Sequence, residues 1–327
     1  MAEALQVLRA LSDGRFRSGE ELAAILGCSR SAIWKHVRRL RQQAGLQIDA
    51  VTGRGYRLSE PLELLDRESI LQHLSAQQRA VLGALHVEDV VGSTNELALQ
   101  RARQVATSPQ AWLAESQTGG RGRRGRSWHS PYGRNLYFSL LHQFDMPLHR
   151  LAGLSVAVGL ELAGMLADLG LREHGLKWPN DLHWQGGKLA GILIELHGES
   201  EGPASAVIGI GLNVDLGTPP EWLDQPVCSL TDAGLDVSRN RLAGELIGRM
   251  LSLCERFAAE GLAPFAQYWP RYGLYQDEPV SLSGPGSQHV GVLRGLSPDG
   301  GLRIQLNNGE RVFYGGELSL RRDVLDV

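Results

Sequence analysis

Apolar and polar positions near the N-terminus follow the spacing of short helices. Leu5, Leu8 and Leu11 lie on one face of a first helix. Ser18, with Glu21 three residues later, forms a capping box that begins a second helix extending to residue 26. Two helices are therefore predicted within residues 1–26.

A third helix is predicted directly after them, with one apolar stripe and one basic, polar face. Gly27 ends the second helix, residues 28 and 29 make a tight turn, and Ser29 caps the third helix. The stripe consists of Ile33, Val37 and Leu40. Two helices joined by such a short turn predict a helix-turn-helix.

A basic hairpin follows the third helix. Residues 46–51 and 55–59 have strand character, and Thr52-Gly53-Arg54-Gly55 forms the hinge. Residues 30–57 carry seven Lys or Arg against one acid, in a chain with a formal charge of -3. These features predict a winged helix-turn-helix that binds DNA; the alternative is a solvated charged face on a protein-interaction module. The residues expected to contact DNA are Ser29, Arg30, Ser31, Trp34, Lys35, Arg38, Arg39 and Arg54.

The remaining pattern predicts a mixed sheet covered by helices, that is, an α/β (α+β) fold class. Residues 61–83 form a helical linker. Strands are expected at residues 86–91, 111–115, 135–142, 188–196 and 206–213. Residues 151–169 are strongly apolar but carry Glu161 and Asp168, so we expect a buried helix and no membrane partner. Beyond residue 270, strands at 280–282, 290–295, 301–306 and 311–314 predict a small β-barrel.

Composition agrees with a globular protein of a reducing compartment. The length of 327 residues favours two or three domains, and 43% of the residues are hydrophobic and 21% charged. Cys28, Cys228 and Cys254 include no Cys-x-x-Cys pair, so neither a disulfide framework nor a zinc site is indicated. The N-terminus lacks the layout of a signal peptide, and we expect a cytoplasmic protein.

The most unusual segment is a loop in which four arginines alternate with glycines, from Gly119 to Trp128. Glycine lets backbone amides face a ligand, and guanidinium groups bind phosphate or carboxylate oxygens. The loop leads toward a strand and does not open a helix, which excludes a Rossmann site; Lys188 precedes Leu189, which excludes a Walker A motif. A flexible solvated loop and an RNA contact are the alternatives to an anion site.

Ordered motifs elsewhere in the chain resemble one family. They are Gly92-Ser93-Thr94-Asn95, Gln117, the arginine loop, Lys177-Trp178-Pro179-Asn180-Asp181, Lys188-Leu189-Ala190-Gly191-Ile192-Leu193 and Gly209-Ile210-Gly211-Leu212-Asn213-Val214. Together they closely resemble bacterial bifunctional biotin ligase/biotin operon repressors, the BirA type, over essentially the whole chain. The resemblance implies a winged-helix domain (1–62), a class II synthetase-like catalytic domain (63–270) and an SH3-like β-barrel (271–327).

The resemblance also implies a two-step reaction. The carboxylate of biotin attacks the α-phosphate of ATP, with Mg²⁺ present, to form biotinyl-5'-AMP. A lysine of the biotin carboxyl carrier protein of acetyl-CoA carboxylase then attacks this mixed anhydride. No covalent enzyme nucleophile is required, but the anionic reactants need neutralising cations.

Site residues follow from the matching motifs. Those implied to bind biotin are Ser93, Thr94, Asn95, Gln117, Arg121, Gly122, Arg123 and Lys188. Those implied to bind ATP or the adenylate are Arg121, Arg123, Arg124, Arg126, Trp128, Lys177, Asn180, Asp181 and Asn213. The expected catalytic residues are Arg123, Lys177 and Lys188, with Asp181 as the candidate metal ligand.

Each assignment has a structural alternative. Ser93 to Asn95 could form only a helix cap, and Lys188 could be a strand-edge lysine. Trp128 would close over adenine by resemblance, but it could instead anchor the end of a mobile loop. Asn180 and Asp181 after proline could be an ordinary turn. We expect the arginine loop to order with ligand, because ordering it without one costs conformational entropy.

The resemblance implies that biotinyl-5'-AMP acts as corepressor: the liganded enzyme forms a homodimer through its central sheet and binds a palindromic operator. The alternatives are a ligase whose winged helix no longer represses, a biotin-sensing repressor without catalysis, and a lipoate ligase. At the C-terminal end, Gly315-Gly316-Glu317 would support binding of ATP or carrier protein, or belong to a structural cap.

Overall fold

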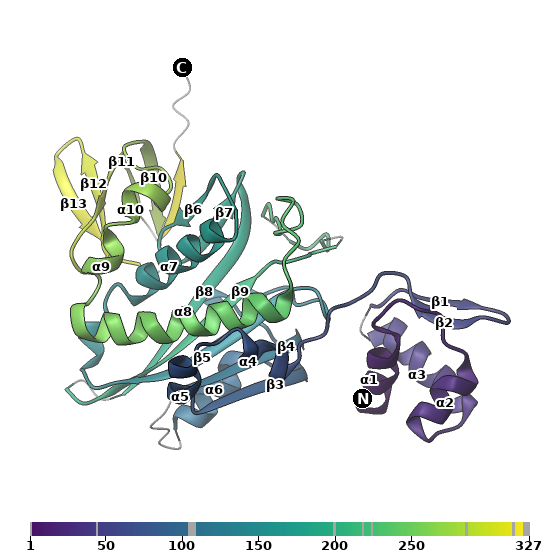
Figure 1. Cartoon of the computed structure of the whole chain (residues 1–327). Helices are drawn as coiled ribbons and strands as arrows, with labels where there is room; N and C mark the ends of the chain where they lie inside the picture. Colours follow the sequence, from purple (N-terminus) through teal and green to yellow (C-terminus); the bar gives the residue numbers. More distant parts are fainter. Residues whose placement is uncertain are drawn as a thin grey trace.

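The computed structural model describes residues 2–43, 45–103, 109–198, 201–217, 219–223, 225–284, 287–315 and 318–322. Figure 1 shows a small N-terminal unit of helices and a hairpin beside a larger body, in which helices cover a long central sheet and a second sheet lies at the C-terminal end. This arrangement confirms the predicted mixed α/β fold. The boundaries at residues 62 and 270 stay a prediction.

The N-terminal unit has the predicted winged helix-turn-helix elements: α1 (Ala2–Leu11), α2 (Gly19–Leu26), α3 (Arg30–Gln43), β1 (Ile48–Val51) and β2 (Gly55–Leu58). The capping box is present, because the Glu21 amide donates to the Ser18 hydroxyl at 3.1 Å and the Ser18 amide donates to the Glu21 carboxylate at 2.6 Å. Gly27 ends α2 with a φ of 62°. Local sequence signals therefore account for where α2 begins and ends.

One strand contact in this unit was not predicted. Arg17 and Tyr56 exchange backbone hydrogen bonds, both 2.9 Å long, so the segment before α2 pairs with the wing. Gly55 permits this approach, because a Cβ at position 55 would overlap the Arg17 carbonyl group. The wing is thus anchored to the helices.

The central sheet is mixed and has the strand order β3-β4-β5-β9-β8-β7-β6. Its strands are β3 (Ala84–Val91), β4 (Gln110–Gln117), β5 (Leu136–Phe144), β6 (His174–Lys177), β7 (Asp181–Trp184), β8 (Gly187–Gly198) and β9 (Ala204–Leu212). The β3 and β4 pair is parallel and all other pairs are antiparallel. All five predicted strands are confirmed; β6 and β7 were not predicted.

Helices cover both faces of this sheet. They are α4 (Arg67–Gln72), α5 (Ala76–Val81), α6 (Thr94–Ala102), α7 (Leu154–Asp168) and α8 (Arg239–Glu260), with short 3₁₀ turns at Arg123–Gly125 and Leu148–Leu151. Alternation along the strands separates the two faces. Trp112 and Leu141 pack with α6, whereas their neighbours Leu113 and Leu140 belong to the main core with α7 and α8. The cavity that most of the predicted site residues line opens on the α6 face.

Helix α7 is the apolar segment predicted as a buried helix. Within the described residues it is the one helix long and apolar enough to span a membrane, when counted with the preceding turn as Leu148–Asp168. In the fold, 61% of its most apolar window is buried, and it packs against α8 and the sheet. The prediction of a buried helix is confirmed.

The C-terminal region forms a second antiparallel sheet in the order β13-β12-β11-β10-β14. It comprises α9 (Ala263–Ala266), α10 (Trp269–Tyr272), β10 (Pro279–Gly284), β11 (Ser287–Leu296), β12 (Leu302–Leu306), β13 (Gly309–Phe313) and β14 (Ser319–Arg322). The four predicted strands are present, and β14 was not predicted. An SH3-like barrel stays a prediction, and Gly316 and Glu317 lie outside the described residues. The Trp178 indole donates to the Gly300 carbonyl at 3.0 Å and joins the two sheets.

A buried ion pair holds the linker after the winged helix against the sheet. The Arg239 guanidinium on α8 lies 2.8 Å from the Glu115 carboxylate on β4, and both side chains are almost fully buried. Arg239 also donates to backbone carbonyls of Glu63, Gly133 and Asn135. A second contact joins the N-terminal unit to the body. Tyr132, which precedes β5, is buried in the hydrophobic core of the N-terminal unit.

Candidate functional site

A cavity of about 370 Å³ opens on the α6 face of the central sheet. The arginine loop crosses it, strands β8 and β9 form its floor, and Leu318 to Arg321 of the C-terminal region reach its edge. The predicted biotin and ATP residues that line it are Ser93, Thr94, Asn95, Gln117, Arg121, Gly122, Arg123, Arg124, Arg126, Trp128, Lys177, Asn180, Asp181 and Lys188. Motifs far apart in the sequence therefore meet at one site.

The arginine loop has a defined backbone conformation. The Gly122 amide donates to the Arg126 carbonyl at 2.7 Å, and the Trp128 amide donates to the Gly120 carbonyl at 2.9 Å, so the loop folds back on itself. Gly120 is required by close packing, because a Cβ there would lie 2.9 Å from both the Gln117 amide and the Ser130 hydroxyl. The glycines thus allow the loop to close tightly on the sheet.

Trp128 ends the loop on the floor of the cavity. Its indole lies over Gly191 and Gly211, and the Lys188 ammonium lies 5.4 Å from the ring centroid. The indole N–H is buried and has no protein hydrogen-bond partner. Trp128 is therefore both the anchor of the loop and a wall of the cavity.

The polar end of the cavity lies where α6 begins. Ser93 is at the N-cap position, but its side chain makes no capping hydrogen bond, so a cap does not explain this serine. Gln117 fixes the next residue, because its side-chain oxygen accepts from the Thr94 amide at 2.9 Å. Asn95 is tied to β8 through the Glu195 carboxylate at 2.8 Å. This end presents hydroxyl and amide groups to a neutral polar ligand.

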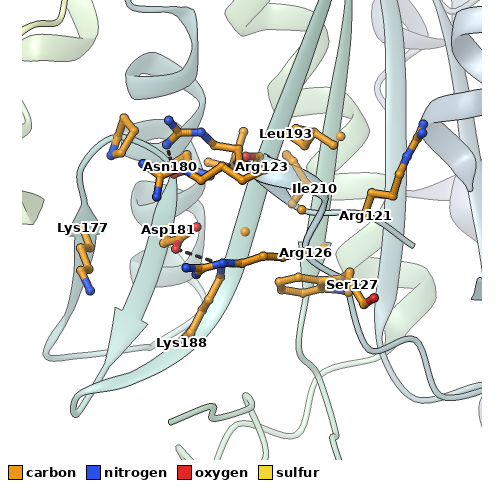
Figure 2. A pocket seen from close by; sticks show the side chains of 18 of the residues that line it. Arg121, Arg123, Arg126, Ser127, Lys177, Asn180, Asp181, Lys188, Leu193 and Ile210 are labelled. Atoms are coloured by element: carbon orange, nitrogen blue, oxygen red, sulfur yellow. Dashed lines mark hydrogen bonds and ion pairs between the residues drawn. The ribbon is translucent and has the colours of Figure 1, made fainter. Parts of the chain in front are cut away.

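The opposite end is cationic. Figure 2 shows the side chains of Arg123, Arg126 and Lys188 converging with Asn180 and Asp181, whereas Arg121 points away from them. Arg123 donates to the Asn180 side-chain oxygen at 2.9 Å. Lys188 pairs with Asp181 at 2.9 Å. Because β8 lies between β7 and β9, a strand-edge lysine does not describe Lys188.

Burial and charge perturb two cations here. Burial lowers the pKa of Lys177, and Asp181 opposes that effect while Arg321 adds to it. Burial also lowers the pKa of Arg123, and Asp181 again opposes this. A guanidinium stays charged at neutral pH even so. Cations held in a partly desolvated cavity attract an anionic ligand more strongly than cations in water do.

Asp181 is the residue that could hold a divalent cation. One of its carboxylate oxygens pairs with Lys188, and the other is buried without a protein partner. In the part of the chain that the structure describes, no three His, Cys, Asp or Glu side chains cluster as a metal site. Mg²⁺ often binds through one carboxylate, waters and substrate phosphates, so the donor set fits a cation that arrives with a nucleotide.

One predicted nucleotide residue does not line the cavity. The Asn213 side chain is buried behind Lys188 and donates to the backbone carbonyls of Lys188 and Cys228, at 3.2 and 3.0 Å. It ties the 226–228 segment to β8. Its predicted contact with ATP stays a prediction, and the observed contacts describe a residue that positions its neighbours.

The predicted DNA-binding residues lie on the exposed surface of the N-terminal unit. Ser29 lies just before α3, Arg54 lies in the wing, and the rest are on the polar face of α3. Trp34 is 52% exposed, and the Arg38 guanidinium lies 5.6 Å from its ring centroid. Arg30 is paired with Glu20. The arrangement matches a recognition helix with an adjacent wing.

Several residues that line or support the cavity were not among the predicted site residues. Arg321 on β14 brings a cation from the C-terminal region to the cavity, and Gly209 contributes to its floor. Ser139 and Glu195 contact Asn95 from β5 and β8. Gly209 lies in a motif already noted, but a lone arginine, serine or glutamate carries no local signal.

The sequence of the chain is similar to known protein families and to known proteins. The biotin/lipoate A/B protein ligase family model matches residues 87–213, an HTH domain model matches 3–57, and the biotin protein ligase C terminal domain model matches 277–321. The bifunctional ligase/repressor BirA of Escherichia coli (strain K12) is 39% identical over 318 residues, 97% of each chain. The corresponding protein of Bacillus subtilis (strain 168) is 32% identical, over 93% of this chain and 94% of that one.

A solved structure agrees with these sequence comparisons. The biotin protein ligase of Aquifex aeolicus in complex with biotin and ATP superposes with a TM-score of 0.62 at 30% identity. The alignment covers 74% of this chain and 100% of that chain. The similarity therefore includes the fold that carries the cavity.

Proposed function

The chain belongs to the family of bifunctional biotin ligase/repressors, and from this premise we propose that its cavity activates biotin with ATP for transfer to a carrier lysine while its winged helix represses transcription. The observation that supports the ligase most directly is the meeting, in one cavity, of a neutral polar end and a cationic end. Biotin has the same two ends, a cyclic urea and a carboxylate. The cavity thus suits biotin lying with its carboxylate toward Lys188.

The first step joins biotin to ATP. A biotin carboxylate oxygen bonds to the α-phosphorus, the bond from that phosphorus to the bridging oxygen breaks, and pyrophosphate leaves. Arg123, Lys177 and Lys188 neutralise the approaching anions, which would otherwise repel each other. Asp181 would hold Mg²⁺, which supplies further neutralisation of the phosphates. The role of these side chains is binding and charge stabilisation.

In the second step the neutral amine of a carrier lysine attacks the carbonyl carbon of biotinyl-5'-AMP. A carbon–nitrogen bond forms, AMP leaves, and the lysine proton passes to solvent. The arginine loop covers the activated carbonyl, and we propose that it orders with ligand and keeps water away until the carrier arrives. The carrier is the biotin carboxyl carrier protein of acetyl-CoA carboxylase, and the enzyme acts in the cytoplasm, where that protein and DNA are present.

Repression uses the exposed basic face of α3 and the wing. We propose that biotinyl-5'-AMP favours a homodimer through the central sheet, so that two recognition helices meet the two halves of a palindromic operator. A family member could instead retain the ligase alone. The exposed positions of Trp34, Lys35 and Arg38 favour retained DNA binding.

One experiment tests the ligase. The protein is incubated with biotin, magnesium ATP and a carboxyl carrier domain, and the carrier is weighed by mass spectrometry. A mass gain of one biotinyl group on a lysine is expected, and no gain would refute the ligase. The same assay with lipoate in place of biotin tests the alternative that the protein is a lipoate ligase. A gel shift with promoter DNA, with and without biotin and ATP, tests repression.

A further inference from the structure

A buried chain of hydrogen bonds lies behind the polar end of the cavity. Ser139, which is fully buried, places its hydroxyl 2.6 Å from the Asn95 side-chain oxygen and 2.8 Å from the Thr94 hydroxyl. Glu195 places a carboxylate oxygen 2.8 Å from the Asn95 side-chain nitrogen. The two reaction steps assign no role to Ser139 or Glu195.

The chain sets the orientation of the Asn95 amide. Its nitrogen has two hydrogens, and its two neighbours, the Glu195 carboxylate and the Leu193 carbonyl at 3.3 Å, can only accept. Both hydrogens are therefore used inside the protein. The Asn95 oxygen must then lie on the other side, over Gly209, which lines the cavity.

The hydroxyl protons follow from this orientation. Ser139 has one proton, and it goes to the Asn95 oxygen, which can only accept. Thr94 then directs its own proton either to Ser139 or to the Gln117 oxygen at 3.2 Å, and in both cases into the protein. What remains on the Asn95 and Thr94 oxygens is lone pairs, so both groups act as acceptors.

We propose that Glu195 and Ser139 are positioning residues that set the polar end of the cavity to accept N–H groups from the substrate. The inference rests on the proposed function, because the cyclic urea of biotin offers two N–H donors. Glu195 is decisive in this arrangement since a carboxylate cannot donate. A glutamine at this position could donate, and Asn95 could then turn its nitrogen toward the cavity.

The test compares Glu195→Gln and Ser139→Ala with the unaltered full chain. Each variant should raise KM for biotin about tenfold, as expected for one charge-assisted hydrogen bond, while kcat stays within about twofold and KM for ATP does not change. Glu88→Gln makes the same substitution at an exposed site on β3 and should leave all three constants unchanged.

Two biotin analogues, each methylated at one ring nitrogen, separate lost acceptors from a deformed pocket. The unaltered enzyme should discriminate against at least one analogue, and Glu195→Gln should discriminate less. An unchanged KM for biotin in both variants, or an equal rise for biotin and both analogues, overturns the inference. Thermal unfolding before the assay shows whether Ser139→Ala is folded. If it is not, the result for Glu195→Gln decides the test, because that substitution keeps the size and shape of the side chain. Failure of the unaltered chain to transfer biotin would instead refute the proposed function.

Discussion

The indole of Trp128 rests directly on the backbone of Gly211. A Cβ at position 211 would lie 2.6 Å from the indole Cζ2, and a Cβ at Gly191 on the neighbouring strand would lie 2.9 Å from Cζ3. Real side chains do not approach each other so closely. The arginine loop therefore closes over a floor that must be made of glycine.

Gly211→Ala should displace Trp128 and open the loop. We expect kcat/KM for biotin to fall at least tenfold, corresponding to about 1.4 kcal/mol or more of lost transition-state stabilisation. Gly164→Ala is the matched control, because a Cβ at that helical position meets nothing within 4 Å. It should keep full activity and raise the free energy of unfolding by about 0.5–1 kcal/mol. Steady-state biotinylation and urea unfolding measure both effects, and a fully active Gly211→Ala would contradict the role of the floor.

Arg123→Gly should let the activated intermediate escape. Arg123 links the arginine loop to Asn180 at 2.9 Å, and the substitution removes this tie together with a cation facing the cavity. Lysines of an unrelated protein in the same tube should then become biotinylated, which mass spectrometry detects. The unaltered enzyme at equal carrier turnover is the control. Labelling that stays confined to the carrier would show that the loop does not retain the adenylate.

Breaking the buried pair between Arg239 and Glu115 should be costly. Arg239→Met leaves the Glu115 charge unpaired in the core, and we expect a loss of about 3–5 kcal/mol in the free energy of unfolding. Arg241→Met removes an exposed pair with Glu245 on the same helix and should cost less than about 1 kcal/mol. Urea unfolding measures both. A similar small loss for the two variants would disprove the stabilising role of the buried pair.

Stability should fall in mild acid because of partly buried histidine side chains. Burial lowers the pKa of His142 to about 4, from 6.5 in an exposed chain. Between these pH values the unfolded chain binds more protons, so the free energy of unfolding falls as pH falls, by up to about 1.4 kcal/mol per pH unit for this group. His142→Gln should reduce that slope between pH 6.5 and 4.5.

His149→Gln makes the same substitution at an exposed site and is the control for the change in slope. His183, whose pKa burial also lowers to about 4, should maintain part of the dependence in both variants. Denaturant unfolding at a series of pH values gives the comparison. Equal slopes for His142→Gln and the unaltered chain would rule out His142 as a source of acid sensitivity.

Arg38→Ala should remove one contact between the protein and a DNA phosphate. The plot of log affinity against log salt should become shallower by about one, because one fewer counterion is released. Arg79→Ala removes an exposed arginine from α5 in the body and should not change the slope. Titration of operator DNA at several salt concentrations measures it, and biotinylation by Arg38→Ala should remain normal. An unchanged slope would remove Arg38 from the DNA contact.

Sequence patterns predicted the elements whose signals are local. The capping box at Ser18, the break at Gly27 and five strands of the central sheet were all identified, because each depends on neighbours within a few residues. Strands β6 and β7 escaped, since four residues are too few to show a period. Of the site, every predicted biotin or ATP residue except Asn213 lines the cavity.

Order and composition along the chain were enough to establish the family, the mixed α/β fold and the segments that meet at the cavity, because motifs are runs of neighbouring residues. Packing decided what those segments do to one another. Ser139 reaches Asn95 across 44 residues of sequence and Arg239 reaches Glu115 across 124. No periodicity encodes such pairs, because strand register and helix packing bring them together only when the whole core forms. The contact between the Trp128 indole and the backbone of Gly211 is likewise decided by tertiary packing.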